Sequence, residues 1–325
     1  MEGTTCTFLK ISHHTDLSVS GYTTFSDTAI KAMARQGMQS FGKDILWAPD
    51  GSIYHLGAKK GEINNRLITV GDHGRANTLA ELLDKDTPTF SILSSRLFRI
   101  HSGCYKGVPV SIVGIGMGAP MMDFFVRETS YLIEGPMAVI RLGSCGLSNP
   151  SLAPGTVVTC TKGSMYCYTN YGYFDGFATE ESTEATKPYV VTKAVPSDPE
   201  LTKLLVKALK DRNVPYHEGL NIACETFYSC QGRDDGVYQD ENAYLLDLFQ
   251  KLGIDSVEME THGLFNLAKR CKYPILASGC AVGIVNRTNP NITSNVSAEM
   301  FHQNILNAGK SCLDALAGIV LPNEK

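Results

Sequence analysis

Residues 67 to 75 read Leu-Ile-Thr-Val-Gly-Asp-His-Gly-Arg, a short apolar run that ends in a glycine-bearing turn. Such a run is typical of a buried strand, and the stretch 76–83 that follows it favours a helix. The same order recurs along the chain, and it predicts an α/β fold in which one central mixed, mostly parallel sheet lies between two layers of helices. Further strands are expected at 90–101, 108–113, 138–142, 156–160, 256–259 and 275–282.

Helix boundaries are marked by capping residues and by proline and glycine. Pro120 stands at the first turn of a strongly apolar segment that Gly135 closes. Ser197 and Glu200 match a capping box ahead of an amphipathic stripe, and Ser297 precedes a long C-terminal apolar pattern. These signals predict three helices that begin near residues 120, 198 and 298.

Length and composition favour a single large domain. The chain has 325 residues, of which 43% are hydrophobic, and it contains no internal repeat and no recognisable linker. Residues 1–45 are polar and glycine-bearing, so we expect them to form an N-terminal extension that a partner subunit orders. The folded domain is expected to span residues 46–325.

Charge and cysteine usage exclude several classes of partner. The formal net charge is -4 and the isoelectric point is near 6.1, without a basic run, so neither nucleic acid nor a membrane surface is an expected partner. The ten cysteines show no CxxC pair and no metal-like spacing, and residues 1–20 lack an apolar signal-peptide core. We therefore expect free thiols, no metal site and a cytoplasmic protein.

The segment 225–233, Glu-Thr-Phe-Tyr-Ser-Cys-Gln-Gly-Arg, carries the clearest binding signal. Phe227 can stack on a flat heterocycle, while Gln231 and Arg233 offer donors and one acceptor that suit a pyrimidine edge with two carbonyls and an N–H. This composition predicts a uracil-binding pocket. On these residues alone, a solvated surface loop remains the alternative.

A glycine motif offers a different interpretation. Gly114, Gly116 and Ala119 follow a strand and open a helix, as in the phosphate-binding turn of dinucleotide enzymes. The acidic residue that should follow the next strand is missing, and Arg141 stands near that point instead, which would suit NADP. An NADP-dependent oxidoreductase is therefore an alternative to nucleoside chemistry.

Five segments taken together resemble the uridine phosphorylases of the nucleoside phosphorylase-I family, in order and in approximate spacing. The resemblance extends from about residue 50 to the C-terminus, and its Phe-x-x-x-Gln-x-Arg spacing is the part specific for uracil, whereas Val-Glu-Met-Glu is shared with purine nucleoside phosphorylases and nucleosidases. The segments are 70–75, 114–118, 140–146, 227–233 and 257–260.

The resemblance implies reversible phosphorolysis of uridine to uracil and ribose 1-phosphate, a reaction of pyrimidine salvage. Inorganic phosphate is then a co-substrate, and no cofactor is expected. Phosphorolysis of other nucleosides on the same fold and a non-catalytic nucleoside-binding protein remain alternatives.

The implied site residues fall into three groups. Arg141, Gln231 and Arg233 are expected to stabilise the charges of the reaction, with Phe227 stacking near the base. Glu260 is expected to accept hydrogen bonds from the ribose hydroxyls, although a helix cap would also suit it. Phosphate is expected at Gly71, Arg75, Arg96, Arg141 and Ser144, and ribose at His55, Ser144, Glu258, Met259 and Glu260.

The resemblance also implies a homo-oligomer, most simply a homodimer, with active sites shared between subunits. His55 and Arg96 would reach into the neighbouring site, with Arg99 as the alternative to Arg96. Two positions besides Ser144 depart from the family pattern: His73 stands where proline is common, and Leu97 stands where bacterial members carry an acidic cation ligand. Ser144 replaces the usual threonine but keeps its hydroxyl.

Overall fold

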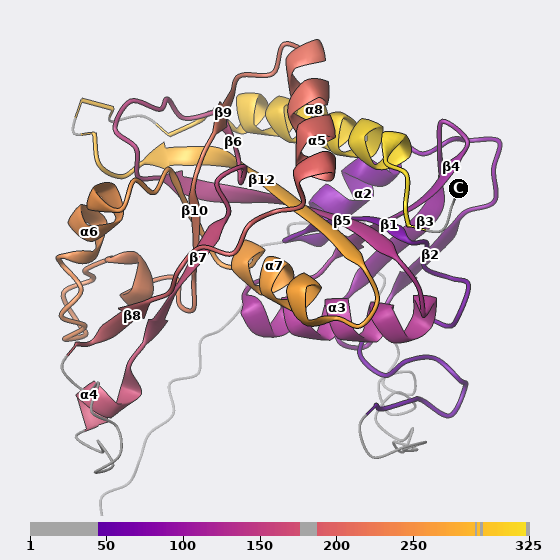
Figure 1. Cartoon of the computed structure of the whole chain (residues 1–325), viewed down its shortest axis with the longest axis horizontal. Coiled ribbons are helices and arrows are strands. Elements are labelled where there is room, and N and C mark those ends of the chain that lie inside the picture. The colour runs from indigo at the N-terminus through magenta and orange to yellow at the C-terminus, as the bar shows by residue number, and fades with distance from the viewer. Residues whose placement is uncertain (1–44, 176–186, 290, 293–294, 323–325) are drawn as a thin grey trace, which may run out of the picture. The chain divides into compact units, whose positions relative to one another are not determined.

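A mixed sheet forms the centre of the molecule in the computed structural model (Figure 1). β1 (Arg66–Val70) lies parallel to both β4 (Val108–Gly114) and β5 (Met137–Leu147). β5 also pairs in parallel with the long β12 (Ile275–Asn286). The predicted strand at 67–70 is therefore confirmed as an inner strand of the sheet.

The structure describes residues 45–175, 187–289, 291–292 and 295–322, which belong to one compact unit, residues 38–325. Residues 1–44 of the predicted N-terminal extension lie outside the described residues. The ordering of this extension by a partner subunit therefore stays a prediction. The sheet runs in the order β2-β3-β4-β1-β5-β11-β10-β7-β8, with β12, β6 and β9 branching from β5. Its other strands are β2 (Phe90–Leu93), β3 (Arg99–Tyr105), β6 (Val157–Thr159), β7 (Ser164–Thr169), β8 (Tyr189–Val191), β9 (Tyr216–Glu218), β10 (Asn221–Cys224) and β11 (Ser256–Glu258).

Helices cover both faces of the sheet, which confirms the predicted α/β/α sandwich (Figure 1). In one layer, α2 (His73–Ala80), α5 (Pro199–Asp211) and α8 (Ala298–Gly318) pack on the sheet. In the other layer, α3 (Ala119–Ile133) and α7 (Thr261–Arg270) do so. The short α4 (Tyr171–Asp175) and α6 (Leu245–Lys251) lie at the β8 end.

The two cores follow from the alternation of side chains along each strand. Ile68 and Val70 of β1 pack with Leu79 and Leu313 in the first core, whereas Leu67 points into the second. A strand buried on both faces calls for a nearly continuous apolar run, which the chain carries at 67–70 apart from the buried Thr69.

Two predicted helix starts differ from the structure. α2 begins at His73 rather than at residue 76, because the Asp72 carboxylate accepts a hydrogen bond from the Arg75 N–H (2.8 Å) and caps the helix. α5 is capped by Asp198, whose carboxylate accepts from the Leu201 N–H (2.8 Å), and not by Ser197 as the capping box predicted. The Ser297 cap of α8 is confirmed, as its hydroxyl accepts from the Met300 N–H (3.1 Å).

The predicted strand 90–101 was wrong in one respect, since a turn at 94–98 divides it into β2 and β3. Leu97 in this turn has a φ of +65°, and the Ser94 hydroxyl accepts hydrogen bonds from the N–H groups of Arg96 (3.3 Å) and Phe98 (3.0 Å). The turn therefore projects Arg96 away from the sheet.

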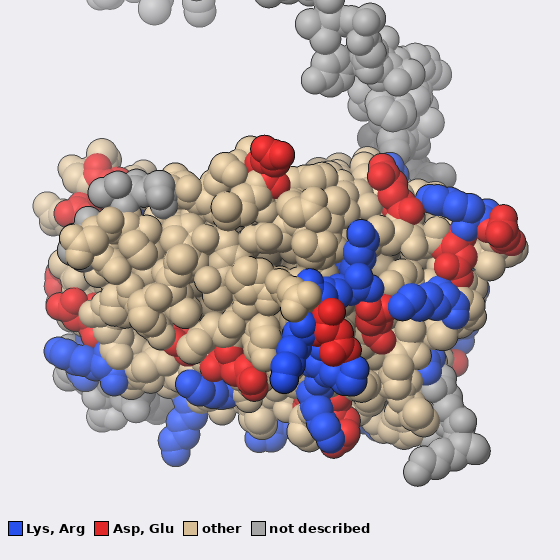
Figure 2. All heavy atoms as spheres, turned by 90° about the horizontal axis from the view of Figure 1, so that it is seen from above, with Lys and Arg blue, Asp and Glu red and all other residues tan. Residues whose placement is uncertain are grey.

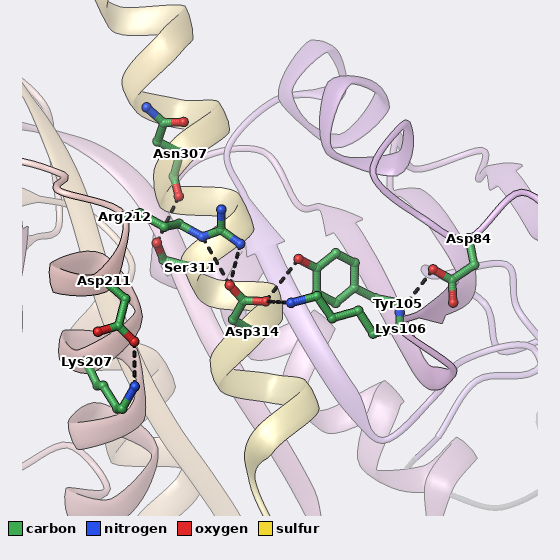
Figure 3. Close-up of polar contacts among 9 residues, drawn as sticks. All are labelled: Asp84, Tyr105, Lys106, Lys207, Asp211, Arg212, Asn307, Ser311 and Asp314. Carbon is green, nitrogen blue, oxygen red and sulfur yellow. Dashed lines mark hydrogen bonds and ion pairs between the residues drawn. The ribbon is translucent and has the colours of Figure 1, made fainter.

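Asp314 links α8 to the β3–β4 hairpin and to the end of α5 (Figure 3). Its Oδ1 accepts hydrogen bonds from the Tyr105 hydroxyl (3.0 Å) and from Lys106 Nζ (2.6 Å), both from the β3–β4 hairpin. Its Oδ2 accepts from Arg212 Nη2 (2.5 Å), just past α5. One carboxylate thus ties together three segments that are distant in sequence.

Surface and thiol chemistry agree with the composition. Lysine and arginine are interspersed with aspartate and glutamate on the face shown in Figure 2. The nine cysteines among the described residues are free thiols. No helix that the structure describes is long and apolar enough to cross a membrane, and the described side chains include no group of three or more potential ligands arranged for a metal ion.

Candidate active site

A cavity of about 330 Å³ at the ends of β1, β5 and β11 brings together most of the predicted site residues. This volume is in the range of small-molecule sites. His55 and Arg96 do not line it. The predicted residues that do are Gly71, Arg75, Arg141, Ser144, Phe227, Gln231, Arg233, Glu258, Met259 and Glu260.

Two guanidinium groups converge above Gly71. A Cβ added to Gly71 would lie 2.8 Å from Arg75 Nη2 and 3.6 Å from Arg141 Nη2, so only glycine leaves room for this approach. Arg75 is held by the carboxylate of Asp72, and Arg141 projects from β5 with 3% of its surface exposed. The turn after β1 and the strand β5 thus place two fixed positive charges side by side.

Several N–H groups of these arginines have no protein acceptor. Among the described residues, Nε and Nη1 of Arg141 and Nη1 of Arg75 are buried without a hydrogen-bond partner. A buried donor left unpaired costs about 1–3 kcal/mol, and more when the group is charged. Donors of this kind, beside a glycine backbone, fit an anionic oxygen ligand such as phosphate.

Glu260 lies next to this anion site and already carries protein partners. Its Oε2 accepts a hydrogen bond from Arg141 Nη2 (2.5 Å), and its Oε1 accepts from the Gly118 N–H (2.5 Å). Strand β11 ends at Glu258, and the backbone turns so that Glu260 becomes the residue before α7. The backbone therefore turns within the Val-Glu-Met-Glu segment 257–260.

The hydrogen bonds that cap α7 come from Glu258 and not from Glu260. The Glu258 carboxylate accepts from the N–H groups of Glu260 (3.0 Å) and Thr261 (3.0 Å). Burial, followed by the nearby Glu260 carboxylate, raises the pKa of Glu258, whereas Arg141 and Asn221 oppose that rise. The helix cap considered for Glu260 is thus made by the Glu258 side chain. The Glu260 carboxylate lines the cavity.

The base-recognition segment forms a tight turn at the cavity. Gln231 ends a 3₁₀ turn (Ser229–Gln231) and is 2% exposed, and Gly232 follows with a φ of +62°. Arg233 Nε donates to the Phe227 carbonyl (3.1 Å), and its guanidinium carbon lies 4.1 Å from the centre of the Phe227 ring. Burial lowers the pKa of Arg233. Arg233 Nη2 also donates to Gln231 Oε1 (3.5 Å), so Arg233 contacts both of the other predicted uracil-binding residues, while Phe227 remains 45% exposed.

Arg287 supports the base-recognition turn from outside the cavity lining, and the sequence did not reveal it. It follows β12, and its Nη1 and Nη2 donate to the carbonyls of Gln231 (2.6 Å) and Gly232 (3.3 Å). Burial, followed by the charge of Arg233, lowers the pKa of Arg287 to about 10. Its side chain also passes close to Gly146, where an added Cβ would lie 2.8 Å from Arg287 Cδ, a contact that no sequence pattern signals.

His55 and Arg96 form a separate group outside the cavity. Arg96 Nη2 donates to the Tyr54 hydroxyl (2.9 Å), and the Tyr54 ring lies 5.1 Å from the ring of His55. His55 stacks on Phe124 and bonds through Nδ1 to the Glu128 carboxylate (2.5 Å). The two residues predicted to serve a neighbouring subunit thus lie together, and away from the site of their own chain.

The glycine motif of β4 and α3 takes part in the same cavity. Gly118, at a φ of +96°, precedes α3 and donates its N–H to Glu260. Gly116 adopts a φ of +83°, a conformation that side-chain-bearing residues rarely reach. Gly118 thus brings the backbone up to a carboxylate, whereas a dinucleotide enzyme would bind pyrophosphate at such a turn.

Residues 65–320 match the family model described as the phosphorylase superfamily. The chain belongs to the phosphorylase superfamily. The resemblance found in the sequence is thereby confirmed, and the oxidoreductase alternative has no support.

The relatives of the chain include pyrimidine and purine enzymes. A uridine phosphorylase from Thermococcus kodakarensis is 28% identical over 67% of this chain and 73% of its own length. A purine nucleoside phosphorylase from Caldanaerobacter subterraneus is 30% identical over 66% of this chain and 81% of its own. A solved uridine phosphorylase structure from the oomycete Phytophthora capsici covers 88% of this chain and 100% of its own, at 34% identity and a TM-score of 0.80.

Proposed function

We propose that the protein catalyses reversible phosphorolysis of uridine to uracil and ribose 1-phosphate. One observation carries this proposal: a single cavity is lined both by the Arg75–Arg141 pair with its unpartnered N–H groups and by Phe227, Gln231 and Arg233. The first set suits phosphate, and the second suits a uracil edge. Glu260, paired with Arg141, is the acceptor available for ribose hydroxyls between them.

The reaction needs no protein nucleophile. Phosphate attacks C1′ as the glycosidic bond breaks, so the protein positions phosphate and stabilises negative charge that develops on the uracil. In our proposal Arg75 and Arg141 hold phosphate, and the donors of Gln231 and Arg233 stabilise the departing base. Preorganised donors of this kind contribute roughly 3–4 kcal/mol each to transition-state stabilisation. Phosphate is a co-substrate, and we propose no cofactor.

The separate position of His55 and Arg96 favours active sites shared across a homodimer. Two exposed apolar side chains lie beside them, Leu97 (61% exposed) next to Arg96 in sequence and Phe124 (37%) stacked on His55. Burial of such side chains against a second copy would bring the Tyr54–His55–Arg96 group to another chain's cavity.

Purine nucleosides are the second candidate substrates, because purine nucleoside phosphorylases are also among the relatives. Phosphate-dependent base release from uridine, thymidine, inosine and adenosine separates the two possibilities. We expect uridine to be cleaved with the highest kcat/KM, and Arg233→Ala to reduce that value by about a hundredfold. Preferential cleavage of inosine or adenosine, or near-normal uridine kinetics in Arg233→Ala, would overturn the assignment of uridine.

A further inference from the structure

Glu258 lines the cavity, yet its carboxylate is already occupied by the protein. Its Oε2 accepts hydrogen bonds from the N–H groups of Glu260 (3.0 Å) and Thr261 (3.0 Å). Its Oε1 accepts from the Thr261 N–H (3.2 Å) and from Asn221 Nδ2 (2.8 Å). A carboxylate offers about four acceptor positions, and the Thr261 N–H is shared between both oxygens, so three donors leave at most one position for a sugar hydroxyl.

Asn221 is fixed by a network that runs across three neighbouring strands. The residue is fully buried on β10, and its Nδ2 also donates to the Ser164 hydroxyl on β7 (2.8 Å). Its Oδ1 accepts from the Ser256 hydroxyl on β11 (2.8 Å). Because the oxygen is held by Ser256, the amide must present its N–H side to Glu258.

The network ends at the residue that faces the substrate. By holding the N–H groups of Glu260 and Thr261, Glu258 fixes the backbone at the start of α7. From that backbone the Glu260 carboxylate reaches Arg141 and the Gly118 N–H. A shift of the turn would therefore move the ribose acceptor relative to the anion site.

We propose that Asn221 and Glu258 are positioning residues, which lock the turn 258–261 so that Glu260 faces the ribose. This inference rests on the proposed function and deepens it. It assigns Glu258 an indirect role in place of the ribose contact expected from the sequence. Asn221, which no motif singled out, becomes part of the machinery through the two carboxylates.

The decisive variant is Asn221→Asp, which replaces the donor to Glu258 with a second carboxyl group. Two facing carboxyl groups hold a shared proton at low pH, and they repel each other once it is lost. We expect the variant's KM for uridine to rise about tenfold more than that of the wild type between pH 6 and pH 8. Its affinity for free uracil, which lacks the ribose, should stay within about twofold of the wild-type value at each pH.

Other charged or ionisable groups face Glu258 as well, namely Glu260, Arg141 and the thiols of Cys145 and Cys160. These groups are present both in the wild type and in Asn221→Asp. Their effect on the KM for uridine is therefore already contained in the wild-type pH profile. The matched control is Asn64→Asp. Asn64 Nδ2 donates to the main-chain carbonyl of Val110 (2.9 Å), outside the cavity, and we expect this variant to follow the wild-type profile.

Equal losses of affinity for uridine and uracil in Asn221→Asp, or a pH profile like that of the wild type, would overturn the inference. If that variant does not fold, Glu258→Gln serves instead, since an NH₂ group would then face backbone N–H donors. Its KM for uridine should rise about tenfold, without a change in uracil affinity. Failure of the wild type to cleave uridine would overturn the proposed function itself, and this inference with it.

Discussion

Arg141 and Glu260 form an ion pair that is buried on both sides, with Nη2 2.5 Å from Oε2 and each side chain 4% exposed. The pair joins the residue expected to bind phosphate to the residue expected to bind ribose. Breaking one partner of a buried pair leaves the other charge uncompensated, so changes at either residue affect both halves of the site.

Glu260→Gln tests the ribose half of this pair. One acceptor oxygen becomes a donor group, so we expect the KM for uridine to increase about tenfold or more, while binding of free uracil changes little. Steady-state kinetics and uracil titration provide the two values. Glu218→Gln, an exposed residue of β9, is the control. Equal weakening of uridine and uracil would exclude a role for Glu260 in ribose binding.

Gly71→Ala tests the phosphate half. The new Cβ would lie 2.8 Å from Arg75 Nη2, so the guanidinium must move away from the anion site. Since displacement of a binding group by about 1 Å can cost up to a hundredfold, we expect the KM for phosphate to rise about tenfold or more. Gly318→Ala, where nothing lies within 4 Å of the added atom, is the control. An unchanged KM for phosphate would remove Gly71 and Arg75 from the phosphate site.

Mixing two inactive variants tests whether active sites are shared. If His55 serves the neighbouring cavity, a heterodimer of Arg233→Ala and His55→Ala chains contains one site with both defects and one intact site. We therefore expect refolded mixtures to regain part of the wild-type activity.

The control for this experiment is a mixture of Arg233→Ala and Arg141→Ala chains. Both residues line the cavity of their own chain, so every site in that heterodimer keeps one defect and activity should not return. If heterodimers form and neither mixture regains activity, His55 does not act across an interface.

Asp314→Asn should destabilise the protein in a pH-dependent manner. Although burial alone would raise it, hydrogen bonds from Lys106, Arg212 and Tyr105 hold the pKa of Asp314 below its ordinary value of 3.8. A lowered pKa contributes stability that is present above pH 3.8 and is lost as pH falls through the folded-state value. Because the carboxylate is partly exposed, we expect a loss of about 1 kcal/mol at pH 7.

Thermal unfolding of Asp314→Asn and of the wild type, each at pH 7 and at acid pH, measures how the stability difference depends on pH. The difference in Tm should shrink as the pH approaches and passes below 3.8. Asp211→Asn, which breaks an exposed ion pair with Lys207 on α5, should have a smaller effect at pH 7. A Tm difference that is the same at both pH values would assign the effect of Asp314 to packing.

The sequence predicted the layers of the fold because local patterns and burial agree there. The short, mostly apolar run of β1 suits a strand buried on both faces, and Pro120 lies in the first turn of α3 as its position indicated. The exact first residues of the helices were harder to predict from the sequence. Ser197 matched a capping box, but Asp198 is followed by Pro199, whose fixed φ suits the first helical position, and the cap lies there.

Site residues were predictable where chemistry and spacing coincide in one segment, as at 227–233. Arg287 was not, because its role arises from a close approach to Gly146 and from carbonyl contacts that no spacing records. The family resemblance implied that Glu258 and Glu260 would both contact the ribose. The strand ends at Glu258, so the two carboxylates meet different partners.

In the proposed reaction, phosphate cleaves the glycosidic bond of uridine in this cavity. The most direct measurement follows phosphorus NMR and uracil release together, with uridine in the presence and absence of inorganic phosphate. We predict equal amounts of ribose 1-phosphate and uracil with phosphate, no uracil without it, and a large loss of both products in Arg141→Ala. Uracil release that does not depend on phosphate, or no release from uridine at all, would contradict the account.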